Sequence, residues 1–355
     1  MKGGMLKRRH MLSGLVLAVG APRLGRADSV AVSVAPPPLT LLVAGPDGQQ
    51  TSRWGDACAL AMEGSFPGNP AINTMPVGGL DGVTGANRLD ALVVPDGKTA
   101  AILPGAALIA FLAGDSRVHF DPTRWTPLLA GSNSGVLMLR APAGKTPDLA
   151  LLRTMAPVRI GADSPQSADL AALLGLARLG VAAAPVFGLR DTAAKTRAFI
   201  AGEVDAVFIS GEGVPEDLAA LSASGAAPAF SLGALGANGQ VTADPLFPDL
   251  PDALAFGPGT APFLDTAYQA AAAAARLDFL LVLPKLTDAT SVALWRSAAT
   301  TASAAPGLSA AADASAIALQ PATVLASALA ALNLQPNDQA SLQTFLAKTY
   351  GWQPS

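Results

Sequence analysis

The sequence is poor in the residues that form disulfides, metal sites and activated nucleophiles. Cys58 is the only cysteine, so no disulfide can form within the chain. Of the two histidines, His10 lies in the leader described below, which leaves His119. One cysteine and one histidine cannot build a typical zinc or transition-metal site, and nothing near His119 supports a Ser-His-Asp triad. We therefore expect no metal, no cofactor and, apart from the carboxylates discussed below, no catalytic residue.

Charge is also scarce and unevenly distributed. Charged residues make up 14% of the 355 residues and hydrophobic residues 51%, which is typical of a globular chain long enough for about two domains. Six of the 23 basic residues fall in residues 1–27, and the remaining 17 face 26 acidic residues, a net charge near −9. This balance argues against nucleic acid and anionic membrane surfaces as partners.

Residues 1–27 have the pattern of an export signal. A basic stretch, "MLKRRH", precedes a short apolar stretch, "MLSGLVLAVGAP", and "GRA" ends at Ala27 in a small-residue cleavage site. The apolar stretch is shorter than the roughly 20 residues that a membrane span needs. Arg8 and Arg9 resemble a twin-arginine signal without its usual phenylalanine, so an ordinary secretory leader and an uncleaved amphipathic N-terminus are the alternatives. We expect a periplasmic protein cleaved near Ala27.

Strand-like and helical patterns alternate after a proline-rich linker at 28–38. This alternation predicts a mostly parallel α/β sheet covered by helices. The expected strands are 39–44, 71–77, 99–105, 135–142, 158–162, 184–189 and 204–210. The expected helices are 52–63, 86–92, 106–114, 146–155, 168–180 and 192–202, with further helices in the C-terminal region.

Two apolar strands, 135–142 and 277–284, are candidates for crossings between two lobes. The first lobe would comprise 39–140 plus 278–355, and the second 141–277. Two lobes joined by two hinge strands form a cleft. Because open α/β sheets bind ligands at the carboxyl ends of their strands, strand-to-helix loops would line it.

Some chemistry-bearing patterns do not survive inspection, and one remains open. "DGKTA" and "AGKTPD" lack the first glycine of a phosphate-binding loop, since Leu92 and Leu139 stand there. Asp47, Asp163 and Glu212 fall near predicted strand ends and could serve acid–base catalysis. Helix capping or turn formation is the reading that we favour for each.

The order of motifs resembles the Bug family, the periplasmic solute-binding receptors of tripartite tricarboxylate transporters. The resemblance covers nearly all of 39–350. It implies a two-lobed α/β fold of the type 2 periplasmic-binding-protein kind, a small-molecule ligand in the cleft, delivery to the membrane permease subunits, a monomer and no enzymatic activity. Its markers are "GPDGQQTS", "VGGLDGVTGAN", "VPDGKTAAILPG", "FDPTRWTPLLAG", "GVLMLRAP", "IGADSPQSADLA" and "AGEVDAVFIS".

The resemblance also implies where the ligand binds. Two loops at strand-to-helix junctions would present unpaired helical N–H groups, which can hold an anionic oxygen without Arg or Lys. Strips near 104 and 209 would complete the site. The implied contact residues are Gly45, Pro46, Asp47, Gly48, Gln49, Gln50, Thr51, Pro104, Gly105, Ala106, Ala162, Asp163, Ser164, Pro165, Gln166, Ser167, Ile209 and Ser210.

This sequence departs from the family pattern within those loops. Gln49 replaces the second of two glycines, Ser52 replaces an aspartate, and Leu189-Arg190-Asp191 replaces a Tyr-Lys-Gly stretch. If Asp47 and Asp163 face the cleft, they repel a dicarboxylate by roughly a kcal/mol or more per close charge pair. The ligand would then differ from a citrate-like acid and be an amide-bearing, neutral or cationic molecule. Alternatively, both aspartates point away and cap turns; the predicted ligand is thus a small carboxylate- or amide-bearing molecule. Two other functions stay open: an orphan receptor that feeds a sensor protein, and an exported carboxylate-based hydrolase or lyase.

Overall fold

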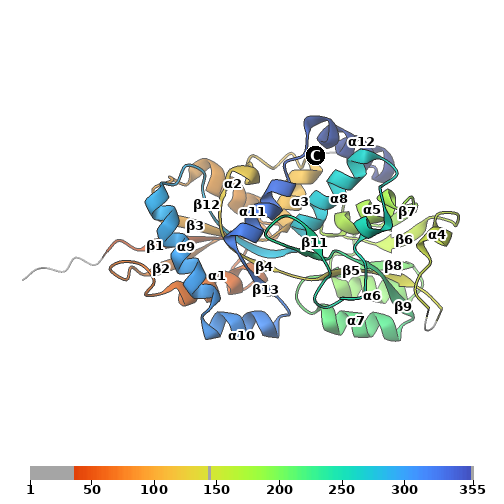
Figure 1. The fold of residues 1–355 in the computed structure, drawn as a ribbon, viewed down its shortest axis with the longest axis horizontal. Helices are drawn as coiled ribbons and strands as arrows, with labels where there is room; N and C mark the ends of the chain where they lie inside the picture. The colour runs from red at the N-terminus through yellow and green to blue at the C-terminus, as the bar shows by residue number, and fades with distance from the viewer. Residues whose placement is uncertain (1–35, 143–144, 353–355) are drawn as a thin grey trace, which may run out of the picture. The chain divides into compact units, whose positions relative to one another are not determined.

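Two mixed sheets organise the part of the chain that the computed structural model describes, residues 36–142 and 145–352. The predicted leader, its cleavage near Ala27 and most of the linker lie outside these residues. Figure 1 shows the six-stranded sheet at one end and the five-stranded sheet at the other. We call the part built on the first sheet the first lobe and the part built on the second sheet the second lobe.

The six-stranded sheet has the order β13-β4-β12-β3-β1-β2. β1 pairs in parallel with β2 and β3, whereas β12 is antiparallel to β3 and β4, and β13 is antiparallel to β4. The strands are β1 (Leu39–Ala44), β2 (Ile72–Val77), β3 (Thr99–Leu103), β4 (Thr126–Ser132), β12 (Leu277–Leu283) and β13 (Ala318–Pro321). The associated helices are α1 (Gln50–Met62), α2 (Val83–Leu92), α3 (Ala106–Ala113), α9 (Ala289–Ser303), α10 (Pro306–Ala314), α11 (Ala322–Ala331) and α12 (Pro336–Tyr350).

The five-stranded sheet has the order β7-β6-β8-β5-β9. β6 is parallel to β7 and β8, and β5 is antiparallel to β8 and β9. The strands are β5 (Gly135–Arg140), β6 (Val158–Gly161), β7 (Ala183–Val186), β8 (Ala206–Ser210) and β9 (Ala226–Ser231), with a hairpin of β10 (Ala234–Leu235) and β11 (Val241–Thr242). The helices are α4 (Leu149–Leu152), α5 (Asp169–Arg178), α6 (Thr192–Ile200), α7 (Val214–Ala223) and α8 (Pro262–Ala275).

Three expectations need correction. The sheets are mixed rather than mostly parallel, because β12 and β13 enter the first sheet, and β5 and β9 the second, in the opposite direction. The helix expected at 146–155 is a single turn, Leu149–Leu152. Residues 135–140, assigned to the first lobe, form β5 in the second sheet, because the preceding segment 126–132 is itself a strand, β4.

Apolar strands and amphipathic helices form the core as the pattern predicts. Four consecutive residues of β1, Leu41–Ala44, are fully buried, and α1 packs Trp54, Cys58 and Met62 against the sheet. Cys58 is a core residue, and burial raises the pKa of its thiol to about 12. Gly85 on α2 leaves room for β1, since a Cβ there would lie 2.3 Å from the Cβ of Ala44.

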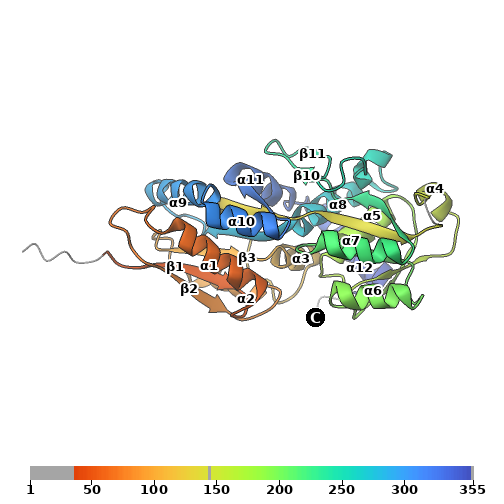
Figure 2. The same ribbon diagram turned by 90° about the horizontal axis from the view of Figure 1, so that it is seen from below.

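Helix α8 connects the two lobes through its packing. It lies against α5 of the second lobe and against α3, α11 and α12 of the first, and the views in Figures 1 and 2 agree on its central place. Its last six residues, Ala270–Ala275, are all alanine and all buried. The core cluster that contains them runs continuously from β1 to β6.

Candidate functional site

The carboxyl ends of the parallel strands in the two sheets face each other. β4 ends at Ser132 and β5 begins at Gly135, which pairs with Ser210 at the carboxyl end of β8. The crossover of residues 133–134 thus joins the two edges directly, and three Cα steps span at most about 11 Å. The return crossing runs beside it, since Asn133 N donates to Arg276 O at 2.7 Å just before β12 begins.

The first predicted loop lies at this edge, between β1 and α1. Gly48 has a φ of +73°, a backbone conformation that favours glycine. Asp47 accepts a hydrogen bond from Ser52 Oγ at 3.3 Å, which ties the loop to the first turn of α1 without capping a helical N–H group. Within the described residues no side chain caps α1, and its first N–H groups, from Gln50 to Ser52, make no hydrogen bond. This end of α1 therefore keeps its donors and its positive dipole end available.

The second predicted loop lies at the matching edge, between β6 and α5, and it is held by its own hydrogen bonds. Asp169, which the sequence analysis missed, is buried and accepts from Asp163 N and Ser167 Oγ, both at 2.9 Å. Its other oxygen accepts from the buried Lys195 Nζ at 2.5 Å. Ser164 Oγ accepts from Gln166 N at 3.2 Å. Most donors of this loop are therefore already satisfied inside the protein.

The two remaining predicted strips are structural in part. A Cβ on Gly105 would lie 2.3 Å from the carbonyl oxygen of Leu277 and 2.4 Å from that of Ala274, so this glycine allows α3 to approach the hinge. Ala162 and Ile209 are fully buried, and Ile209 packs in the core of the second lobe. Ser210 is half-buried at the end of β8.

Asp278 is a site residue that the sequence analysis did not identify. It occupies a β-bulge, because the register between β12 and β4 shifts between Leu277 and Phe279, and such bulges redirect side chains. Its Oδ1 accepts from Gln50 Nε2 at 2.6 Å, while its Oδ2 is buried without a hydrogen-bond partner. Burial, and then the nearby charge of Glu212, raise the pKa of Asp278 to about 7. An acid two residues after Arg276, in an otherwise apolar strand, was the available sequence signal.

Two polar contacts join the lobes on either side of these loops. Glu212, in the loop after β8, accepts from Arg53 NH2 at 2.8 Å and from Trp54 Nε1 at 3.0 Å. On the other side of the loops, Arg117 NH2 donates to Gln166 Oε1 at 3.4 Å. Both loops named by the sequence therefore lie along one junction between the lobes.

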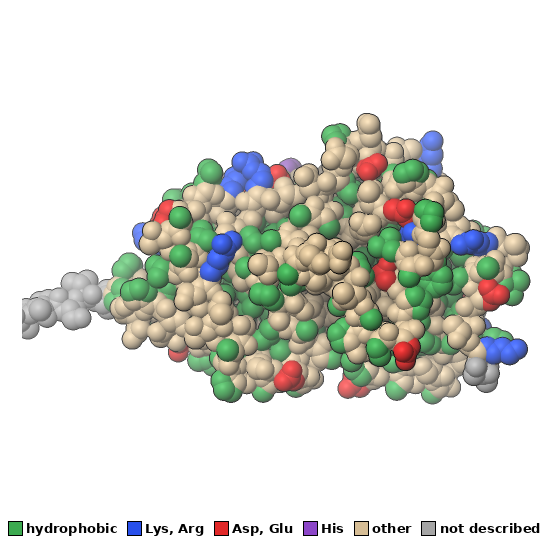
Figure 3. Space-filling view, in the orientation of Figure 1, with side chains coloured by type: hydrophobic (Ala, Val, Ile, Leu, Met, Phe, Trp, Pro, Cys, Tyr) green, Lys and Arg blue, Asp and Glu red, His purple; other side chains and the backbone are tan. Residues whose placement is uncertain are grey.

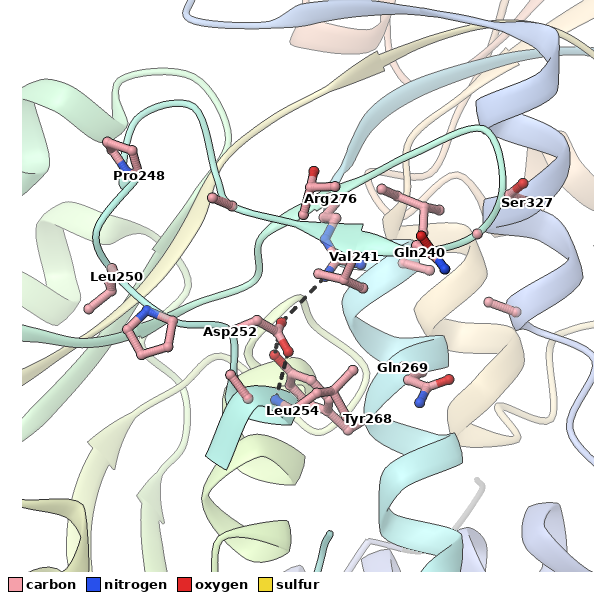
Figure 4. A pocket seen from close by; sticks show the side chains of 18 of the residues that line it. Gln240, Val241, Pro248, Leu250, Asp252, Leu254, Tyr268, Gln269, Arg276 and Ser327 are labelled. Carbon is pink, nitrogen blue, oxygen red and sulfur yellow. Dashed lines mark hydrogen bonds and ion pairs between the residues drawn. The ribbon is translucent and has the colours of Figure 1, made fainter. Parts of the chain in front are cut away.

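A separate cavity of about 740 Å³ adjoins the hinge beneath the β10–β11 hairpin (Figure 4). The buried guanidinium of Arg276 reaches it, donates to the carbonyl oxygens of Leu232 and Gly233, and lies 3.6 Å from Asp252. Tyr268 donates to the same carboxylate at 2.9 Å. Burial lowers the pKa of Arg276 and raises that of Asp252. Because Arg276 is already paired with Asp252 and with two backbone carbonyl groups, it is not free to bind a solute. We therefore do not take this cavity as the main ligand site.

The described residues offer neither a metal-binding cluster nor a membrane-spanning helix. No group of three or more His, Cys, Asp or Glu side chains in residues 36–142 and 145–352 could hold a metal ion. In the same residues, no helix combines the length and apolarity needed to cross a membrane. On the face drawn in Figure 3, Lys and Arg side chains are scattered among hydrophobic and uncharged ones. His119 is exposed.

Comparison with known proteins identifies the fold. No protein-family model and no curated protein matches the sequence. Among solved structures, a TctC solute-binding protein from Polaromonas matches with a TM-score of 0.65 and 18% identity over 88% of this chain and 98% of that one. MatC from Rhodopseudomonas palustris with bound malate gives 0.53 and 17% over 86% and 98%. An R. palustris protein with adipate gives 0.53 and 16% over 88% and 97%.

These similarities confirm the predicted fold. The chain has the two-lobed α/β fold of type 2 periplasmic binding proteins, and the matches span nearly the whole of each solved chain. The motif order that suggested solute-binding receptors of tripartite tricarboxylate transporters thus led to the right architecture.

Proposed function

We propose that the protein is an exported, non-enzymatic solute-binding protein that captures a small carboxylate- or amide-bearing molecule between its lobes. The observation that carries the proposal is the meeting of two carboxyl edges at a crossover of residues 133–134, because ligands of open α/β sheets bind there. The solved structures of the same fold include proteins with malate and with adipate. The motif order extends the proposal to delivery to the membrane permease subunits of a tripartite tricarboxylate-type transporter.

Binding would proceed by lobe closure. The free N–H groups at the start of α1 supply donors for a solute oxygen, and Ser164 and Ser210 supply polar groups from the second lobe. Rotation about the paired crossings at Asn133 and Arg276 would separate the two edges to admit a solute and bring them together again over it, restoring the contacts that Glu212 makes with Arg53 and Trp54 in this structure. The closed form would then present a single surface to the permease.

A thermal-shift screen of residues 28–355 against small acids, amides, amines and aromatic compounds tests this function. A solute at 100 times its dissociation constant should stabilise the folded protein by about 2.7 kcal/mol. Calorimetry should give one solute per chain, and NMR of the same mixture should show no consumption of the solute. The proposal is overturned if no compound binds, or if a bound compound is converted.

A pair of matched variants tests the loop. Gln49→Trp places a bulky side chain in the exposed first loop and should abolish the shift. Gln335→Trp makes the same exchange at the exposed start of α12 and should leave the shift unchanged. Normal binding by Gln49→Trp would show that the solute lies elsewhere.

A further inference from the structure

We propose that Asp278 is a specificity-determining residue of this site and that it selects solutes carrying a protonated amine. The inference rests on the proposed function and adds the chemical class of the solute. It narrows the proposed carboxylate- or amide-bearing solute to one that also carries an ammonium group.

The hydrogen bonding of Asp278 is incomplete in a way that points to a missing partner. In the described part of the chain, its Oδ2 is the single buried side-chain nitrogen or oxygen without a hydrogen bond. Other buried or nearly buried carboxylates here have partners: Asp169 holds Lys195, Asp252 holds Arg276 and Tyr268, and Asp244 accepts from Ser134 Oγ and Leu246 N. A native protein rarely leaves such a group unpaired without a functional reason.

The local charge balance leaves a place for a cation. The charged groups that face Asp278 are Glu212 from the loop after β8 and Arg53 from α1, and the indole N–H of Trp54, which donates to Glu212, also lies near this carboxyl. Arg53 is bound to Glu212 at 2.8 Å, so these two charges offset each other and that of Asp278 has no counterion. An ammonium group can supply both the charge and the donor.

Geometry adds a second contact point for the same solute. Gln50 at the start of α1 donates through its side chain to Asp278 Oδ1 at 2.6 Å, so one side chain links the carboxyl to the helix end that carries the free N–H groups. A carboxylate on the solute would face the N–H groups while its ammonium faces Asp278. Solutes with an amine at one end and a carboxylate at the other meet both conditions.

A solute can reach Asp278 only when the lobes are apart. A Cβ on Gly211, in the loop that carries Glu212, would lie 3.8 Å from Asp278 Oδ1, so this second-lobe loop covers the carboxyl. Separation of Glu212 from Arg53 and Trp54 removes that cover and lets a solute enter.

Calorimetry with length-matched probe pairs at pH 8 tests the inference. The pairs are adipate with 6-aminohexanoate, and succinate with 4-aminobutanoate. In at least one pair, the wild-type protein should bind the amine at least ten times more tightly than the diacid. Asp278→Asn keeps the oxygen that accepts from Gln50 and should weaken amine binding at least tenfold. Asp56→Asn removes the same charge from the exposed face of α1 and should change neither affinity.

The pH dependence of the wild-type protein gives a readout that needs no variant. With a pKa of about 7 for Asp278, amine affinity should fall about tenfold from pH 8 to pH 6 as the carboxyl gains its proton. The ammonium and carboxylate groups of the two amine probes do not titrate in this range.

The outcomes separate this inference from the proposed function. A preference for diacids, an unchanged preference in Asp278→Asn, or flat amine affinity between pH 6 and 8 overturns the role of Asp278, although the protein remains a solute-binding protein. The same holds if other solutes of the screen bind and none of the four probes does. Only a complete lack of binding in the whole screen removes the proposed function as well.

Discussion

Replacing Asp278 by Asn should stabilise the protein at pH 8 but hardly at pH 4. Burial raises the pKa of this carboxyl from 3.8 to about 7 in the folded state. In the unfolded chain it ionises near its ordinary value. Between pH 4 and 7 the folded state therefore holds a proton that the unfolded state has lost, and the free energy of unfolding falls as pH rises. Above pH 7 both states are ionised and the loss is complete.

The magnitude follows from the size of that shift. A difference of about 3 pKa units at 1.36 kcal/mol each gives about 4 kcal/mol, which relaxation around a half-buried side chain reduces to roughly 2–4 kcal/mol. Asparagine has nearly the same shape, accepts from Gln50 and does not titrate. The variant should therefore gain roughly 2–4 kcal/mol over the wild type between pH 4 and pH 8.

Urea denaturation at pH 4, 5, 6, 7 and 8 measures this difference directly. The slope with urea should be the same for both proteins, so that the midpoints report stability alone. Asp56→Asn, on the exposed face of α1, is the control and should show an offset that does not vary with pH. If Asp278→Asn shows the same constant offset, the carboxyl ionises normally in the folded protein and the reasoning is wrong.

Three further predictions concern other contacts. Arg276→Met leaves Asp252 buried without its cation and should lower the free energy of unfolding by about 3–5 kcal/mol in urea. Gly85→Ala forces a methyl group to within 2.3 Å of Ala44 Cβ and should cost about 1–3 kcal/mol by the same measurement. Glu212→Ala removes the hydrogen bonds of Glu212 with Arg53 and Trp54, which join the two lobes. Small-angle scattering without solute should therefore give a larger radius of gyration for the variant. An unchanged value would show that these contacts do not hold the lobes together.

Local patterns were sufficient for the elements that begin the site. The run 39–44 followed by a Gly-containing loop and a helical pattern is a strand-to-helix junction whatever surrounds it, and the structure places β1 and α1 there. The same reasoning located the loop after β6, although the residue that organises it, Asp169, could not be distinguished from an ordinary helix residue.

Long-range relations were beyond that reasoning. The direction of β12 depends on where the chain re-enters the first sheet after passing through the second lobe, so the mixed sheets were not predictable from local alternation. The role of Asp278 depends on a bulge against β4 and on Glu212 from the other lobe. The boundary near 135 was misplaced because β4 was not recognised as a strand, so that 135–142 was taken for the crossing out of the first lobe.

The six alanines that end α8 bear on how the lobes can move. This helix touches α3 on one side and α5 on the other, so any swing about the hinge slides one neighbour across its surface. Methyl groups present a shallow relief with no rotamers to rearrange, and such a surface lets packed helices shift by small steps. A longer side chain at these positions would interlock with the neighbouring helix and hold the angle between the lobes fixed.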